Sequence, residues 1–140
     1  MKAFIAYRFT GENPDELNKL MSAVCEALKA GGVEAYCTLF DSKELMDKTA
    51  GAREIMDHAF SKIDESEFLF VLQTSENKSE GMLMEVGYCV AKNIPIVVAS
   101  KEGFNNTYLP QMGSHTIAWS DTTDLQEKIR STNFRKIVGL

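Results

Sequence analysis

Hydrophobic and polar positions along the chain follow two different periods. Short apolar runs occur near residues 3–7, 33–37, 68–72, 94–99 and 115–119. The runs at 68–72 and 94–99 are continuous, as in strands buried on both faces. Between the runs, apolar residues recur every three or four positions, which indicates amphipathic helices. The pattern therefore predicts strands and helices that alternate along the whole chain.

Four stretches carry the helical spacing. The first begins at Pro14, has apolar residues at positions 17, 20, 21, 24, 25 and 28, and ends at Gly31-Gly32. The second begins at Gly51-Ala52-Arg53, the third covers 81–92 and ends at Asn93, and the fourth covers 123–131 behind Asp121. Residues 38–50 and 101–113 are polar or rich in Gly, Asn and Pro, and they are predicted to be loops.

Strands that alternate with helices pair in parallel through right-handed crossovers. We therefore predict an α/β fold with a three-layer, doubly wound, five-stranded parallel sheet, Rossmann-like or flavodoxin-like, in a single domain over residues 1–140. Ligands of such folds lie beyond the carboxyl ends of the strands. This rule places residues 8–11, 38–50, 73–81 and 101–114 around one crevice.

Composition and charge narrow the classes of function. The 140 residues carry 15 Lys and Arg against 20 Asp and Glu, and this net charge of −5 argues against a nucleic-acid partner. We expect no membrane partner, because no apolar run approaches the roughly 20 residues of a spanning helix and the N-terminus is too promptly polar for a signal peptide.

Cysteine and glycine patterns add two further expectations. Cys25, Cys37 and Cys89 form no CxxC or Cys/His pattern, so we expect buried thiols, a cytoplasmic location and no metal site. The sequence has no GxGxxG after the first strand and no GxxxxGK[ST], so neither a dinucleotide cofactor nor a P-loop is predicted.

Glu85 is the most distinctive polar residue, because it lies within the apolar segment MLMEVGYCVA. Burial disfavours an ionised carboxylate, but a helix start offers N–H groups and a positive dipole end. A carboxylate held beside a sugar could act as a nucleophile. In the competing interpretation, Glu85, Tyr88 and Lys92 lie at i, i+3 and i+7 and form a solvent-facing stripe. The spacing alone favours the stripe.

Three other residues next to predicted strands or helices could bind a ligand. Ser79 and Gly81 are residue types that let a backbone approach a ligand at a helix start, although the local pattern favours an ordinary N-cap with a flexible loop. Arg8 directly follows the first strand and could pair with a phosphate or a carboxylate, or form a surface ion pair. His58 and His115 have no triad or metal partners nearby in the sequence and are interpreted as structural or exposed.

Taken together, these features resemble the nucleoside 2-deoxyribosyltransferase-like superfamily, and within it the 2'-deoxynucleoside 5'-monophosphate N-glycosidases. The resemblance covers most of the chain and includes Phe4–Gly11, Gly51–Arg53, Ser79-x-Gly81-x-x-x-Glu85-x-Gly87 and Gly113-Ser114. It implies an enzyme that cleaves the N-glycosidic bond of a nucleoside or its 5'-monophosphate, by hydrolysis or transfer, without a cofactor.

The resemblance also assigns roles to residues. It implies that Glu85 is the nucleophile and that Ser79 and Ser114 hold the 5'-phosphate, with Ser114 reaching across the interface of a homodimer or higher homo-oligomer. It further implies that Tyr7, Arg8, Gly11 and Gly81 are substrate-binding residues.

The chain departs from this family at two positions, which leaves two alternatives open. Ala59 stands where the family has an aspartate on the helix before the third strand, and Phe4 stands where it has a tyrosine, with Tyr7 out of register. One alternative is a catalytically degenerate nucleotide-binding module. The other is a TIR-like enzyme that cleaves NAD, because the opening strand and Ser79-x-x-Met82-x-x-Glu85 also resemble TIR domains.

Overall fold

The computed structural model describes residues 1–40 and 51–140, and all strand pairs in this part are parallel. The strands are β1 (Lys2–Ala6), β2 (Glu34–Tyr36), β3 (Phe68–Gln73), β4 (Ile96–Lys101) and β5 (His115–Trp119). They form one five-stranded sheet in the order β2-β1-β3-β4-β5, which is the flavodoxin-like order. The predicted α/β fold with a doubly wound parallel sheet is confirmed.

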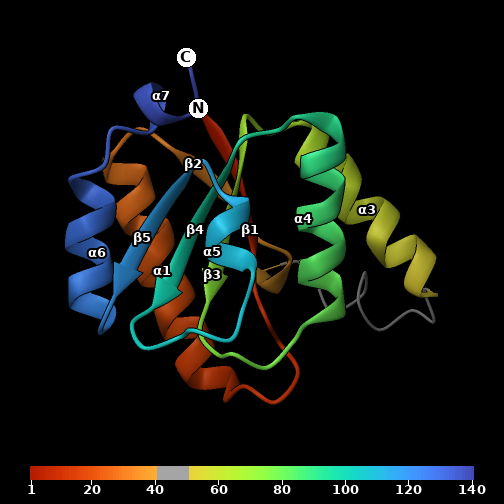
Figure 1. Cartoon of the computed structure of the whole chain (residues 1–140), viewed down its shortest axis with the longest axis horizontal. Coiled ribbons are helices and arrows are strands. Elements are labelled where there is room, and N and C mark those ends of the chain that lie inside the picture. The colour runs from red at the N-terminus through yellow and green to blue at the C-terminus, as the bar shows by residue number, and fades with distance from the viewer. Residues whose placement is uncertain (41–50) are drawn as a thin grey trace.

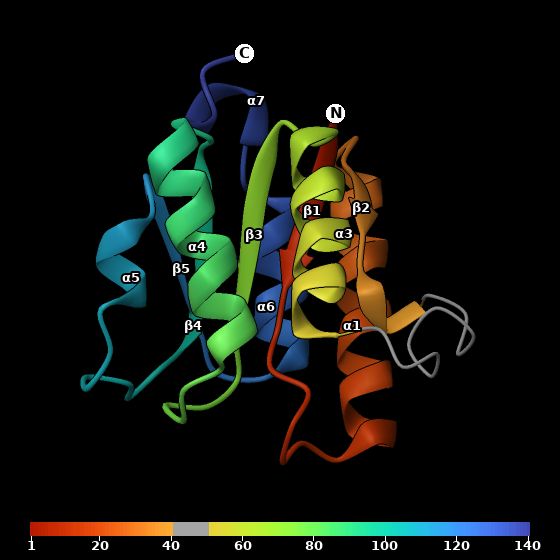
Figure 2. The same cartoon turned by 90° about the vertical axis from the view of Figure 1, so that its right-hand side faces the viewer.

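Helices cover both faces of this sheet (Figures 1 and 2). α1 (Pro14–Ala30) and α6 (Thr122–Arg130) pack on one face, and α3 (Ala52–Asp64), α4 (Glu80–Lys92) and the short α5 (Leu109–Met112) pack on the other. A 3₁₀ turn, η1, covers Thr38–Phe40, and a last short helix, α7, covers Phe134–Ile137. None of the helices in the described part is long and apolar enough to cross a membrane.

The predicted helix boundaries follow from capping side chains. Asn13 begins α1 by accepting hydrogen bonds from the backbone N–H groups of Asp15 and Glu16. Asp121 caps α6 in the same way, by accepting from the N–H of Asp124. Asn93 ends α4 with a left-handed φ of 57°, as its polar side chain allows.

The alternation of side chains along β1 separates two apolar cores. Ala3 and Ile5 pack toward α1 and α6, whereas Phe4 and Ala6 pack toward α3 and α4. β3 lies between β1 and β4 and is buried at every position, as the continuous apolar run predicts. The face that Phe4 covers is therefore also the face on which α4 carries Glu85.

Most strand ends shift by one or two residues from the prediction, and two differences have a clear physical cause. β4 begins at Ile96 rather than at residue 94, because the amide of Ile94 still bonds to the carbonyl oxygen of Cys89 in the helix cap and Pro95 has no N–H to donate. Residues 101–113 are not entirely loop, since they contain α5, with Pro110 in its first turn. Proline is common both in loops and in the first turn of a helix, so Pro110 does not distinguish a loop from a short helix in the sequence. Residues 41–50 of the predicted loop 38–50 lie outside the described part.

Candidate functional site

Glu85 lies on the inner side of α4, where it is only 9% exposed. The predicted solvent stripe is therefore wrong at its first member: Tyr88 is half-buried and Lys92 is exposed, but Glu85 faces the interior. Within residues 1–40 and 51–140, the Glu85 carboxylate has no hydrogen bond or ion pair. A buried carboxylate without a partner destabilises the fold, so the geometry needs a functional explanation.

Burial raises the pKa of Glu85 from 4.5 to about 8. The expected help from the helix start is not available, because α4 begins at Glu80 and Glu85 therefore lies beyond the first turn, where the dipole effect fades. The side chain is thus mainly protonated at neutral pH. A ligand that develops positive charge beside it would favour the carboxylate, because an opposite charge lowers the pKa of an acid.

Cys89 lies one turn after Glu85 and is also buried. Burial, together with the nearby charge of Glu85, raises the pKa of the Cys89 thiol to about 12. A thiol is nucleophilic only as the thiolate, so Cys89 is a core residue rather than a second nucleophile.

A polar clamp at the outer rim joins α3 to α4. Asp64 accepts hydrogen bonds from the Tyr88 hydroxyl at 2.7 Å and from Lys92 Nζ at 2.9 Å, and these bonds lower the pKa of Asp64. The Tyr88 ring stacks on Phe60 of α3, with 4.3 Å between ring centroids. The clamp links the two helices, which lie side by side in Figure 2.

Gly81 lies one turn before Glu85 on α4. Helical side chains lean toward the helix N-terminus, so the Glu85 side chain leans over the position of Gly81, one turn earlier. A Cβ added to Gly81 would meet Met56 Sδ of α3 at 3.9 Å, an ordinary contact. Met56 of α3 therefore lies close to the backbone of α4 one turn before Glu85. Ser79 caps the same helix by accepting from the N–H of Met82 at 3.4 Å.

Phe4 and Ala59 stand where the resemblance implies a tyrosine and an aspartate. Both lie in the apolar core on the face of the sheet that α3 and α4 cover. Phe4 is 1% exposed and its ring centroid is 5.8 Å from that of Tyr36. Ala59 is buried, whereas Asp57 is exposed and pairs with Arg53 at 3.0 Å, so it does not replace the aspartate.

His58 has a polar partner that the sequence did not reveal. The Tyr36 hydroxyl lies 3.0 Å from His58 Nε2, and both residues are half-buried. The pair connects β2 to α3, and no local pattern relates two residues that are 22 positions apart.

The contacts described for Tyr7, Arg8 and Gly11 do not include Glu85. Tyr7 packs against the core on the opposite face, and its hydroxyl lies 3.1 Å from Thr38 Oγ1. Arg8 pairs with Glu12 at 3.4 Å. Gly11 adopts a positive φ of 84°, and a Cβ there would lie 3.0 Å from Arg8 Nη2, so this glycine makes room for the guanidinium.

Ser114 lies at the other end of the sheet from Ser79. It directly precedes β5, and its N–H and hydroxyl both donate to the carbonyl oxygen of Ile96, at the start of β4. Ser79 instead begins α4 at the carboxyl edge. The prediction that the whole 101–114 segment lines the crevice at the carboxyl edge is therefore wrong for Ser114. This residue lies at the amino ends of β4 and β5.

The model of the nucleoside 2-deoxyribosyltransferase family matches residues 7–135 of the chain. Two similar solved structures are the CMP N-glycosidase BcmB of Clostridium botulinum and a 2-deoxyribosyltransferase of Bacillus psychrosaccharolyticus. The first has a TM-score of 0.68 at 15% identity and covers 92% of this chain and 97% of that one. The second has a TM-score of 0.68 at 14% identity and covers 98% and 96%. A comparison with curated protein sequences finds no match.

Proposed function

Because the chain belongs to the nucleoside 2-deoxyribosyltransferase family, we propose that it cleaves the N-glycosidic bond of a nucleoside or its 5'-monophosphate with Glu85 as the nucleophile. One observation carries the proposal: Glu85 is buried and lacks a partner among the described residues. The two solved relatives support it, because one is named for cleaving CMP and the other for transferring deoxyribose.

The proposed reaction has two displacements. A Glu85 oxygen forms a bond to the anomeric carbon while the carbon–nitrogen bond breaks and its electron pair leaves with the base, which takes up a proton. The transition state resembles an oxocarbenium ion, whose positive charge stabilises the carboxylate form of Glu85. Water or a second base then attacks the same carbon from the opposite side and releases Glu85, so the configuration of the sugar is retained.

A panel of nucleosides and their 5'-monophosphates, in ribo and deoxy forms, tests this function. We expect free base in the chromatogram of at least one reaction. Release of nicotinamide from NAD, without base release from the panel, would favour the TIR-like alternative. If a nucleotide raises the melting temperature but nothing in the panel turns over, the chain is a nucleotide-binding module instead.

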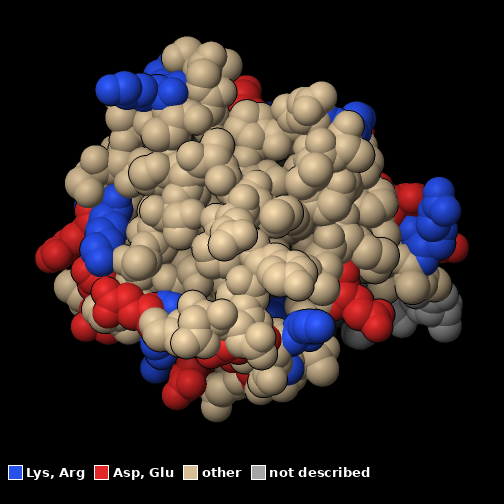
Figure 3. Space-filling view, viewed as in Figure 1, with Lys and Arg blue, Asp and Glu red and all other residues tan. Residues whose placement is uncertain are grey.

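An uncharged surface over α4 and α5 supports a homodimer. Figure 3 shows this surface with Lys, Arg, Asp and Glu gathered around its edge. Exposed apolar side chains on it, here named the apolar face, are Leu83, Met84, Val90, Tyr108 and Met112. Contiguous exposed apolar residues mark interaction sites. A second copy fits here, because an isologous contact needs only one self-complementary surface.

The direction of α4 makes such a dimer relevant to the site. α4 runs from the carboxyl edge of the sheet, where Ser79 lies, toward the amino edge, where Ser114 lies. A twofold axis perpendicular to α4 places two copies of this helix antiparallel. Ser114 of the partner subunit then approaches Ser79, and both hydroxyls can bind one 5'-phosphate.

Val90→Glu is expected to dissociate this dimer. A buried charge without a partner weakens an interface strongly, so the dissociation constant should rise by about 100-fold or more. Light scattering after gel filtration measures the mass. Ile55→Glu is the matched control, because Ile55 is also an exposed apolar residue but lies on α3, outside the apolar face.

The same two variants test whether the dimer is needed for activity on a monophosphate. We expect Val90→Glu to lose activity on a monophosphate, which needs Ser114 of the partner subunit, more than activity on the nucleoside. A wild type that is monomeric at every concentration, or a Val90→Glu protein that stays dimeric, contradicts the proposed interface.

A further inference from the structure

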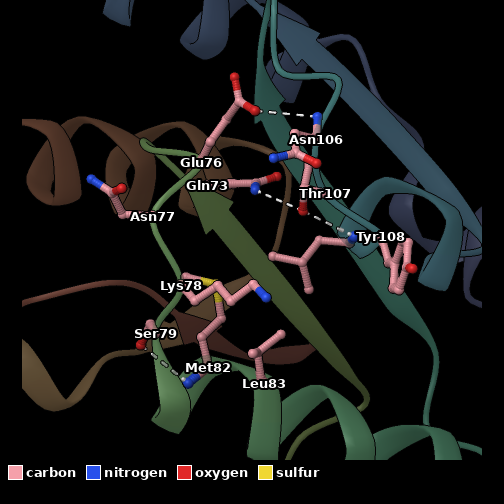
Figure 4. A pocket seen from close by; sticks show the side chains of 11 residues that line it. Gln73, Glu76, Asn77, Lys78, Ser79, Met82, Leu83, Asn106, Thr107 and Tyr108 are labelled. Carbon is pink, nitrogen blue, oxygen red and sulfur yellow. Dashed lines mark hydrogen bonds between the residues drawn. The ribbon is translucent and has the colours of Figure 1, made fainter.

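A cavity of about 480 Å³ contains none of the residues assigned to the proposed reaction. Its lining comes from the N-terminal parts of α1 and α6 and from the last residues of β4 and β5. The charged and aromatic residues in this lining are Glu12, Glu16, Lys19, Lys101, Trp119 and Asp121. The cavity in Figure 4 is a different one, because it is lined by Ser79 and other residues of α4 and shares no residue with this lining.

The alternation of side chains places the cavity on the face of the sheet opposite Glu85. Ala99 and Ile117 belong to the core under α1 and α6, so Lys101 and Trp119, two positions later, project to the same side. Glu85 lies on α4, which covers the other face together with α3. The sheet therefore separates a ligand in this cavity from Glu85.

Trp119 supplies a buried hydrogen-bond donor without a partner. Its side chain lines the cavity and is 4% exposed, and its indole Nε1 has no hydrogen-bond partner within residues 1–40 and 51–140. Buried polar groups in native proteins are nearly always paired, because an unpaired one destabilises the fold. An indole N–H can only donate, so the group that completes this site must be an acceptor.

Two ammonium groups and two helix starts favour an acceptor with negative charge. Lys101 Nζ lies 5.7 Å from the centroid of the Trp119 ring, and Lys19 lies on α1. Neither lysine has an ion pair in the part of the chain that the structure describes. α1 and α6 both begin at this cavity, and Figure 1 shows them side by side on one face of the sheet. A helix N-terminus attracts anions through its free N–H groups and its dipole.

Carboxylates in the lining are largely engaged elsewhere. Glu12 pairs with Arg8 at 3.4 Å, and the Asp121 carboxylate accepts from the N–H of Asp124 at 2.8 Å as the N-cap of α6. Glu16 is exposed and offsets one of the two ammonium groups. One positive charge is left for a ligand, so the cavity suits an anion but binds it with modest affinity.

We propose that this cavity binds a small organic oxyanion, a carboxylate or a phosphate ester. Its oxygens accept from the Trp119 indole and the Lys101 ammonium group, and its carbon skeleton contacts Leu17 and Leu20, which supply the apolar wall of the cavity. The site needs no turnover and lies across the sheet from Glu85, so it is independent of the proposed function.

Fluorescence of Trp119 reports on the cavity directly, because the chain has a single tryptophan. The wild-type protein is titrated with malate and with glycerol 3-phosphate, and sodium chloride at the same ionic strength is the reference. We expect a saturable change with a dissociation constant of millimolar order or below for at least one of the two anions. The anion that responds identifies the ligand as a carboxylate or a phosphate ester.

Two variants test the donors of the site. Lys101→Gln should raise the dissociation constant about tenfold, because it removes a charge-assisted contact. Trp119→Phe should raise it about fivefold, and ligand-observed NMR measures this variant because the fluorophore is lost. Lys29→Gln is the matched control: Lys29 is an exposed lysine in the last turn of α1, outside the lining, so its loss changes the net charge equally. We expect it to stay within about twofold of wild type.

Three results overturn the site. The first is no saturable change with either anion beyond that caused by sodium chloride. The second is equal weakening by Lys101→Gln and Lys29→Gln, which would indicate attraction by net charge alone. The third is binding that persists in Lys101→Gln but is lost in Ser79→Gly, which would place the anion at α4; glycine there keeps most of the N-cap stability. Unfolding curves of each variant separate a loss of binding from a loss of fold, and Lys101 is exposed, so its replacement spares the core.

Discussion

Replacement of Glu85 by Gln is expected to lower kcat for base release by roughly 10³-fold or more. The amide keeps the size of the side chain but supplies no carboxylate to bond the anomeric carbon. Glu85 is the one buried carboxylate among the described residues, so we expect no other carboxylate to take over. Single-turnover assays with the best substrate of the nucleotide panel, analysed by chromatography, measure the loss.

Glu80→Gln is the matched control for that loss. Glu80 lies in the first turn of the same helix and is exposed, so the change removes one carboxylate from α4 without touching the core. We expect its kcat to stay within about twofold of wild type, as for most surface substitutions. A Glu85→Gln enzyme that keeps wild-type turnover excludes Glu85 as the nucleophile. Equal substrate binding by both proteins, without turnover in either, indicates the binding module.

The order of elements could be predicted from the sequence because its signals are local. The period of apolar residues indicated the five strands and the four long helices, and Pro14, Asp121 and Asn93 marked helix ends. Parallel pairing then followed from the alternation of strands and helices. The short helix at Leu109–Met112 was missed, because four residues are too few for a period to show.

The sequence singled out Glu85 as the candidate residue, but it did not show which way this side chain faces. The spacing of Glu85, Tyr88 and Lys92 suggested one solvent-facing stripe, yet the clamp with Asp64 engages only the last two. Which side of α4 faces the core depends on how α3 packs beside it, and that contact joins residues more than 20 positions apart. The pairing of Tyr36 with His58 could not be predicted from the sequence for the same reason.

The free energy of unfolding is expected to fall as pH rises from about 4.5 to about 8, because burial raises the pKa of Glu85 between those values. Below this window both folded and unfolded chains hold the proton, and the stability is fully present. Within it the unfolded chain releases the proton while the folded chain keeps it, so stability is lost by up to about 1.4 kcal/mol per pH unit. Above about 8 the folded chain also ionises, and the loss levels off.

Denaturant unfolding of wild type and Glu85→Gln across this pH range isolates the effect, because the other titrating groups are common to both proteins. The difference between the two curves should follow the titration of Glu85, and a difference that does not change with pH contradicts its raised pKa. Activity should run in the opposite direction. The nucleophile is the carboxylate, so kcat/KM should rise with pH up to an apparent pKa near 8. The burial of Glu85, which has no partner among the residues that the structure describes, thus sets both the alkaline loss of stability and the alkaline gain in rate.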